Sequence, residues 1–241
     1  MSTDIRETVA ARRSKWPLVG VGAGFAGFLA TLIFDVHATL KSDADTDYTM
    51  AIVHEVSQRN GHLSIITGYL TVALLLAAAA CWRTHLEHRL PGRSAAAVVP
   101  LAFASAAGAL SLGYGWKGAL GLYHADGNEP GTFDDMGLYV YYVLNDFGSF
   151  IGWLGVTVAA GAVAWLALRD RILPLWIGIW SVLPVVAVAI PLVTTGLPGF
   201  PGVVSQVWMI VTFTGLFLWK DLPSVQAGTS QGEYGPTAAQ A

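Results

Sequence analysis

The chain is poor in charge, in cysteine and in catalytic signatures. Only 12% of its 241 residues are charged, and its net charge of −3 includes no basic stripe interleaved with aromatic residues, so no nucleic-acid partner is expected. The single cysteine, Cys81, excludes an internal disulfide. The sequence contains no GxSxG, Walker, dinucleotide-binding or HExxH motif. The common hydrolase and nucleotide-dependent enzyme classes are therefore not indicated.

What the chain does contain is a series of long apolar stretches without charge. Hydrophobic residues make up 54% of it, which leaves too few polar residues to cover a soluble surface. The stretches are 16–34, 63–82, 95–114, 148–168, 173–194 and 203–219. Each is about long enough to cross a hydrocarbon core of ~30 Å at ~1.5 Å per residue. The sequence therefore predicts an all-α fold, a polytopic bundle of six transmembrane helices embedded in the lipid bilayer.

Basic residues are unevenly distributed over the segments that join these stretches. With the N-terminus inside, the cytoplasmic side holds ten of the 13 Lys and Arg residues: Arg6, Arg12, Arg13, Lys15, Arg83, Arg89, Arg93, Arg169, Arg171 and Lys220. Only Lys41, Arg59 and Lys117 fall outside. Short loops with this asymmetry follow the positive-inside rule. We therefore predict a plasma-membrane protein with both termini cytoplasmic.

The same sorting divides the chain into three parts. Residues 1–15 form a cytoplasmic N-terminal segment, residues 16–220 form the six-span domain, and residues 221–241 form a cytoplasmic tail. The tail is rich in Gly, Ser, Gln and Pro, a composition typical of disorder.

Two outer segments, 35–61 and 123–147, are long. The first contains a short helical pattern at about 47–58, in which apolar residues such as Val53 are expected to lie on the membrane surface. For the end of the second, 136–147, two alternatives stay open. It is a helix lying flat at the interface, or it is the fourth span projecting beyond the bilayer.

Small residues recur at helical spacing within the spans. Gly20 and Gly24 form a GxxxG pair in the first, and Gly148, Gly152 and Gly155 recur in the fourth. In lipid, such residues permit close approach of helix backbones. We interpret them as packing faces within one bundle. Contact with a second copy, or with another membrane protein, through the same faces is the alternative.

The candidate site is a layer of polar residues near the outer ends of the spans. Counted along the helices from their cytoplasmic ends, Asp35, His62, Lys117 and Asp146 reach similar depth, and Asn145 precedes Asp146. Two acids, an imidazole and an amine in one layer would form an outward-facing pocket for a small ligand or ion. The alternative is ion pairing without a ligand, because helices end at polar interfaces where charge costs little.

Metal and cofactor chemistry have less support. The outer histidines His37, His54, His62 and His124 are candidate ligands of zinc or copper, but no two of them have HxxxH spacing. None of the six spans has a histidine at its middle that could hold a haem. We therefore predict no metal and no cofactor.

The later half of the chain has a familiar pattern. The sequence LPLWIG at 173–178 follows the basic residues Arg169 and Arg171, and a Gly/Pro turn precedes a last span that contains Trp208. Together with the glycines of 148–155, this pattern resembles multi-pass membrane proteins of unknown function that are common in actinobacteria. The resemblance implies a six-helix fold and a plasma-membrane location, and it implies no activity.

Three function classes remain. We favour a non-enzymatic membrane protein that binds or transports a small ligand through the outer polar layer. The second class is a membrane enzyme that uses His62 with Asp35 or Asp146 on the extracytoplasmic side. The third is an accessory or scaffold subunit of a membrane complex. The lack of charge halfway across the bilayer counts against a typical transporter, whose site lies near the midplane.

Overall fold

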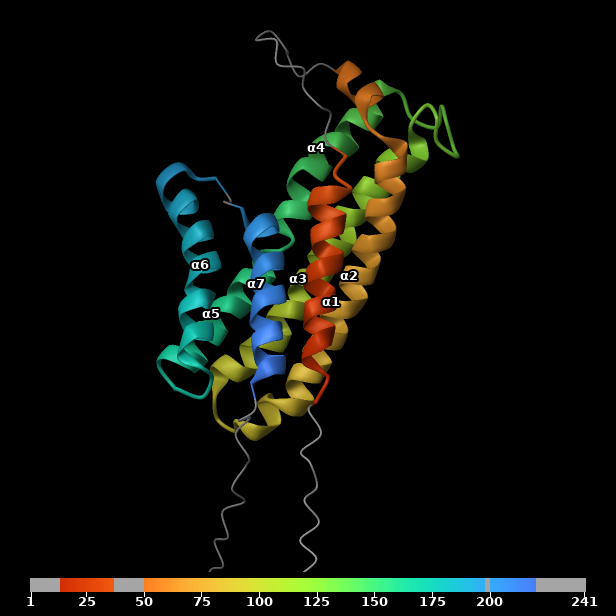
Figure 1. Ribbon diagram of the computed structural model, residues 1–241. Helices are drawn as coiled ribbons and strands as arrows, with labels where there is room; N and C mark the ends of the chain where they lie inside the picture. The colour runs from red at the N-terminus through yellow and green to blue at the C-terminus, as the bar shows by residue number, and fades with distance from the viewer. Residues whose placement is uncertain (1–13, 37–49, 198–199, 220–241) are drawn as a thin grey trace, which may run out of the picture.

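The computed structural model describes residues 14–36, 50–197 and 200–219, and every regular element in these ranges is helical. The elements are α1 (Pro17–Phe28), the π-helical turn η1 (Leu29–Ile33), the 3₁₀ helices η2 (Met50–Glu55) and η3 (Glu87–Arg89), α2 (Gln58–His85), α3 (Ser94–Tyr123), α4 (Asp135–Ile151), α5 (Leu154–Leu168), α6 (Leu175–Thr195) and α7 (Pro201–Leu218). Figure 1 shows an upright bundle with α6 at its edge. The all-α prediction is confirmed for the described residues. The predicted tail 221–241 and His37 lie outside them.

Five helical segments are long and apolar enough to cross a membrane: Gln58–Arg89, Ser94–Tyr123, Asp135–Leu168, Leu175–Thr195 and Pro201–Leu218. A sixth apolar helix, Pro17–Ile33, is shorter and reaches ~25 Å at the rise of an α-helix. These helices follow the order of the six predicted stretches. Five to six potential spans indicate a membrane-embedded protein.

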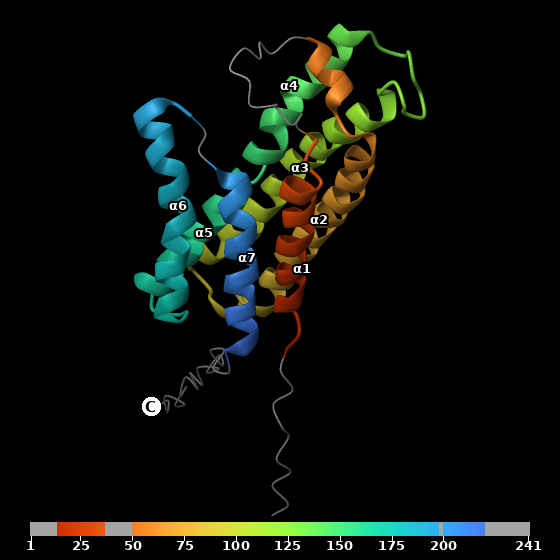
Figure 2. The same ribbon diagram turned by 45° about the horizontal axis from the view of Figure 1, so that its top comes forward.

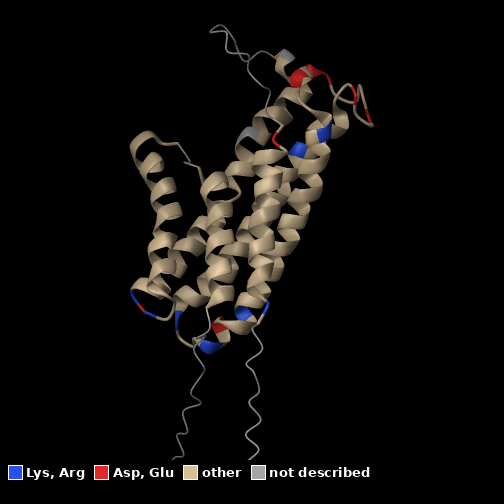
Figure 3. Ribbon diagram, in the orientation of Figure 1, with Lys and Arg blue, Asp and Glu red and all other residues tan. Residues whose placement is uncertain are grey.

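Charged residues gather at the two ends of the bundle. Figure 3 shows Lys and Arg mostly at the lower end, where the loops 86–93 and 169–174 lie, and Asp and Glu mostly at the upper end. We call these the basic end and the acidic end. Helix α1 begins and α7 ends at the basic end (Figure 1). Between the ends, α5, α6 and α7 carry no charged residue.

Helices α2 and α3 are longer than a hydrocarbon core requires. They contain 28 and 30 residues, which corresponds to ~42–45 Å. Helix α2 begins at Gln58, five residues before the predicted start of the span, because Ser57 Oγ accepts a hydrogen bond from the backbone N–H of Asn60 (3.3 Å) and caps the helix. The extra length projects at the acidic end, where α4 and η2 lie beside it (Figure 2).

The projecting parts form a second apolar cluster, which we call the cap. Its buried residues are Val36, Ile52, Val53, Val56, Leu120, Leu138 and Tyr142. The prediction that Val53 lies on the membrane surface is wrong, because Val53 is buried in the cap. The projecting turns of α3 and α4 offer it an apolar protein surface, which a count of spans does not reveal.

The fourth apolar stretch is two helices and not one. Helix α4 ends at Ile151, α5 begins at Leu154, and Gly152 and Trp153 form a break between them. Residues 136–147 therefore lie in α4, which is joined to α5 across a break that neither alternative included. The exposed face of α4 is apolar, with Met136, Val140, Val143, Phe147 and Ile151. Its polar side chains Asn145 and Ser149 are buried, so α4 turns its apolar face outward and its polar face into the bundle.

Glycines set the closest helix contacts, as predicted for the first and fourth spans. A Cβ on Gly20 would lie 2.1 Å from the ring of Phe213, so the first span packs on α7 within the bundle. A Cβ on Gly155 would lie 2.4 Å from the carbonyl oxygen of Ala102 on α3. Both faces are therefore used inside the chain.

Gly113→Ala should destabilise the protein, since the new Cβ would lie 2.6 Å from the backbone of Gly148 and would push α3 and α4 apart. Overpacking of this kind typically costs about 1–3 kcal/mol. Gly108→Ala is the matched control on the same helix, because no atom lies within 4 Å of its Cβ position. Thermal unfolding in detergent measures both, and an equal effect of the two substitutions would contradict the close contact of α3 with α4.

Candidate functional site

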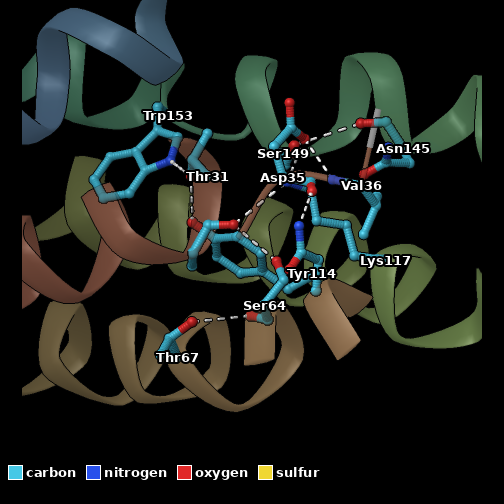
Figure 4. A network of polar contacts seen from close by, with 12 residues as sticks. Thr31, Asp35, Val36, Ser64, Thr67, Tyr114, Lys117, Asn145, Ser149 and Trp153 are labelled. Atoms are coloured by element: carbon cyan, nitrogen blue, oxygen red, sulfur yellow. Dashed lines mark hydrogen bonds and ion pairs between the residues drawn. The ribbon is translucent and has the colours of Figure 1, made fainter. Parts of the chain in front are cut away.

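The structure brings Asp35 and Lys117 together as an ion pair. Lys117 Nζ donates hydrogen bonds to Asp35 Oδ1 (3.2 Å) and to the carbonyl oxygen of Ala30 (3.4 Å). The side chain of Lys117 is 0% exposed and that of Asp35 is 29% exposed, so the pair reaches solvent only through the carboxylate. Figure 4 shows Lys117 pointing toward Asp35.

The end of α1 explains why a backbone oxygen is available to this lysine. The helix ends in a π-helical turn, in which Phe34 N–H donates to Leu29 O (2.8 Å), and its last carbonyls lack partners within the helix. The carbonyl of Ala30 accepts from Ser64 Oγ (2.8 Å) as well as from Lys117. The C-terminal end of a helix is its negative pole, which favours a cation. A carboxylate, a carbonyl and a helix end therefore hold one ammonium group.

Lys117 lies between two apolar clusters. On one face of α3, Tyr114 belongs to the core of the bundle and Leu120 belongs to the cap, one turn away on either side of Lys117. The cap therefore covers the lysine from the acidic end. A buried ammonium costs much free energy unless it is paired and hydrogen-bonded, and the contacts above supply both.

A second set of hydrogen bonds lies on the bundle side of the ion pair. Thr31 and Tyr114 share a hydrogen bond between their hydroxyl groups (2.8 Å), and Trp153 Nε1 donates to Thr31 Oγ1 (3.2 Å). These bonds join the π-helical turn of α1, the middle of α3 and the break between α4 and α5. Nothing in the sequence separates these three residues from other aromatic and hydroxyl residues of the spans.

Asn145 faces Lys117 across the contact of α3 with α4. Gly113 touches Gly148 at this contact, and Lys117 and Asn145 each lie about one turn further toward the acidic end on their antiparallel helices. Figure 4 shows Asn145 and Ser149 on the α4 side of the ion pair. Asn145 is fully buried, and neither Oδ1 nor Nδ2 has a hydrogen-bond partner among the described residues. Each unsatisfied buried group typically costs about 1–3 kcal/mol.

One other predicted member of the layer, His62, is not brought to this pair. His62 is half-buried in the first turns of α2, and its side chain makes no hydrogen bond or ion pair with the described residues. Asp146 follows Asn145 in α4, and its side chain lies outside the described part of the structure. Gln206 of α7 is a second fully buried amide without a hydrogen-bond partner in the described ranges, and it lies at the contact of α7 with α1.

The candidate metal ligands are dispersed. His54 Nε2 lies 3.1 Å from Asp135 Oδ1 at an exposed contact of η2 with α4. His124 Nδ1 accepts a hydrogen bond from the backbone N–H of Asp126 (3.2 Å) beyond the end of α3. Within residues 14–36, 50–197 and 200–219, no three His, Cys, Asp or Glu residues lie together in a group that could hold a metal ion.

Comparisons of the chain with protein-family models, with curated proteins and with solved structures give no match.

Proposed function

We propose that the chain is a six-span plasma-membrane protein with both termini cytoplasmic, and that the layer around Lys117 binds a small zwitterionic solute on the extracytoplasmic side without changing it chemically. The observation that carries this proposal is the fully buried amide of Asn145. It faces the ion pair, and neither its donor nor its acceptor has a partner among the described residues.

The orientation follows from the two ends of the bundle. Arg83, Arg89, Arg93, Arg169 and Arg171 all lie at the basic end. Short loops rich in Arg stay in the cytoplasm during insertion. The acidic end, with Asp35 and the cap, then faces outward.

The ligand class follows from the groups in the layer. Lys117 supplies an ammonium, Asp35 a carboxylate, and the amide of Asn145 one donor and one acceptor group. A solute with its own carboxylate and primary ammonium matches all four, because its carboxylate pairs with Lys117 and with Asn145 Nδ2. Its ammonium then pairs with Asp35 and with Asn145 Oδ1. An uncharged solute would form no new ion pair with Lys117 or Asp35.

Two helix discontinuities at the layer support a binding role. The π-helical turn of α1 and the break after α4 meet through the hydrogen bond from Trp153 to Thr31. Broken helices that expose backbone polar groups are typical of substrate sites in transporters, and π-helical turns are frequent at functional sites. The enzyme alternative that pairs His62 with Asp35 lacks such support, because the side chain of His62 makes no hydrogen bond or ion pair to Asp35 within the described chain.

Glycine should bind the purified protein and raise its melting temperature, as the smallest solute with both groups. A ligand at 100 times its dissociation constant stabilises by about 2.7 kcal/mol. Glycine betaine carries the same charges without an N–H donor and should bind at least about tenfold more weakly, since hydrogen bonds to charged groups contribute about 1.5–3 kcal/mol. Thermal unfolding in detergent, titrated with each compound, measures both.

Asn145→Leu should fold and lose the glycine response. Asn128→Leu is the control, because Asn128 is exposed in the loop at the same end. Since solutes of this kind also stabilise proteins by exclusion from the surface, only a difference between the two variants supports the site. Equal melting-temperature shifts in both would overturn the proposal.

A second candidate function is that of an accessory subunit. It is favoured by α6, whose last turns stand apart from the bundle (Figure 1) and have Ile190, Leu192 and Val193 exposed. Such a surface suits lipid and an apolar partner helix equally. This reading becomes the stronger one if glycine does not bind.

A further inference from the structure

Two adjoining cavities lie at the basic end, opposite the layer around Lys117. They have volumes of about 450 Å³ and 400 Å³ and share the residues Glu87 and Ala97. The first is lined by the connection of α2 to α3: Glu87, His88, Leu90, Pro91, Gly92, Arg93, Ser94 and Ala97. The second runs along the two helices: Ala79, Ala80, Arg83, Glu87, Ala97, Pro100, Leu101 and Ala104.

The two cavities form one groove with a polar and an apolar half. On α3, Ala97, Pro100, Leu101 and Ala104 share one face at helical spacing, so the apolar half extends from the basic end toward the middle of the bundle. The small side chains of Ala79 and Ala80 on α2 keep it open. The groove is charged at the end of the bundle and apolar toward its middle. A phospholipid has the same division into a charged head group and an apolar acyl chain.

The polar half offers donors for a phosphate. Arg93 uses one N–H to bind Asp170 Oδ1 (3.1 Å), and its side chain is 52% exposed, so it has further N–H groups for a ligand. Arg93 is also the residue before α3 and makes no side-chain cap, so of the first three N–H groups only that of Ala96 is bonded, to Arg93 O (3.0 Å), and those of Ser94 and Ala95 are left for an anion. A helix N-terminus and a guanidinium group both favour an anion.

Glu87 decides which phospholipid fits. It lines both halves of the groove, and its Oε2 atom is buried and accepts no hydrogen bond from the described residues, although Arg83 Nε lies 3.5 Å away. A carboxylate at this place repels a head group that carries only negative charge. The same carboxylate attracts a head group that also carries a protonated amine, whose N–H groups donate hydrogen bonds to it.

We infer that this groove binds a phospholipid with a primary-ammonium head group, of the phosphatidylethanolamine type. The phosphate binds Arg93 and the start of α3, the ammonium binds Glu87, and one acyl chain lies along Ala97 and Leu101. This site does not depend on the ligand of the acidic end, so either proposal can fail alone.

Native mass spectrometry of the full chain in detergent tests the site with three lipids of identical acyl chains. Phosphatidylethanolamine should bind at least about tenfold more tightly than phosphatidylcholine, whose quaternary ammonium has no N–H, and more tightly than phosphatidylglycerol. Glu87→Gln should abolish the preference for the ethanolamine lipid. Arg93→Gln should weaken all three about tenfold. Arg171→Gln, an exposed arginine at the same end but outside the groove, should change nothing.

Because Arg93→Gln also removes the partner of Asp170, a variant without charge change is needed. Ala97→Leu fills the junction of the two halves and should block binding of every lipid while leaving the melting temperature unchanged. The inference is wrong if phosphatidylcholine or phosphatidylglycerol binds as tightly as phosphatidylethanolamine. It is also wrong if Glu87→Gln keeps the preference, or if Ala97→Leu keeps binding.

Discussion

Asp35→Asn is expected to destabilise the protein by about 3–5 kcal/mol, the usual effect of removing one partner of a buried ion pair. The reason is that Lys117 stays buried at 0% exposure and loses its carboxylate. Lys117→Met should cost clearly less, because Asp35 is 29% exposed and keeps contact with water. The double variant should regain most of the loss, since an apolar pair can replace a buried ion pair without net cost. Thermal and denaturant unfolding in detergent complete the double-mutant cycle.

The control for this cycle is the contact of His54 with Asp135 at the same end. Its two side chains are 49% and 54% exposed, so Asp135→Asn should change stability by less than about 1 kcal/mol. Equal costs of Asp35→Asn and Lys117→Met would contradict the expected effect of their different burial. Additive costs in the double variant would show that the two residues act independently. The ion pair would then not be what holds α1 to α3.

The long apolar helices could be predicted because each is a long run without charge, and a bilayer leaves helices as the only structure for such a run. The ends of the elements could not be predicted in the same way. Helix α2 begins at Gln58 because of one hydroxyl cap, and α4 breaks at Gly152 and Trp153 without a proline. These features depend on which side chains fill the contacts, and hydropathy does not carry that information.

In the candidate site, the depth of each residue could be predicted from the sequence, but the direction in which its side chain points could not. Counting residues from the basic end placed Asp35 and Lys117 at one depth, and the structure joins them. The same count placed His62 there, but it makes no hydrogen bond or ion pair to either residue in the described chain. Rotation about the helix axis decides contact, and it is fixed by glycine contacts such as Gly61 with Gly121. Those contacts become visible only when the helices are packed.

The depth of a residue along its helix also gives no information on backbone groups that take part in the layer. The Ala30 carbonyl is available because α1 ends in a π-helical turn just before Asp35. Sequence gives no signal for that turn. The hydroxyl of Ser64 and the ammonium of Lys117 approach the same oxygen from two other helices, so the end of α1 organises three helices around one atom.

Trp153→Ala is expected to cost about 3–5 kcal/mol, as for other buried tryptophans. The indole is fully buried, and its ring lies so close to Gly27 that a Cβ there would be 2.2 Å from it. Its loss removes both this contact of the α4–α5 break with α1 and the hydrogen bond to Thr31. Trp153→Phe removes the donor and part of the ring but keeps an aromatic group, so it should cost less, about 1–3 kcal/mol. Thermal unfolding in detergent measures both.

Trp165→Ala is the matched control, because Trp165 lies on α5 and is 58% exposed, and its effect should stay within about 0.5 kcal/mol. The hydrogen bond itself is tested in the Thr31→Val background. There Trp153→Phe should cost less than in the unchanged chain, since its partner is already gone. If the cost is the same in both backgrounds, the indole stabilises the break by packing alone. The hydroxyl of Thr31 then contributes through its hydrogen bond with Tyr114, and the two helix discontinuities are held together by packing contacts.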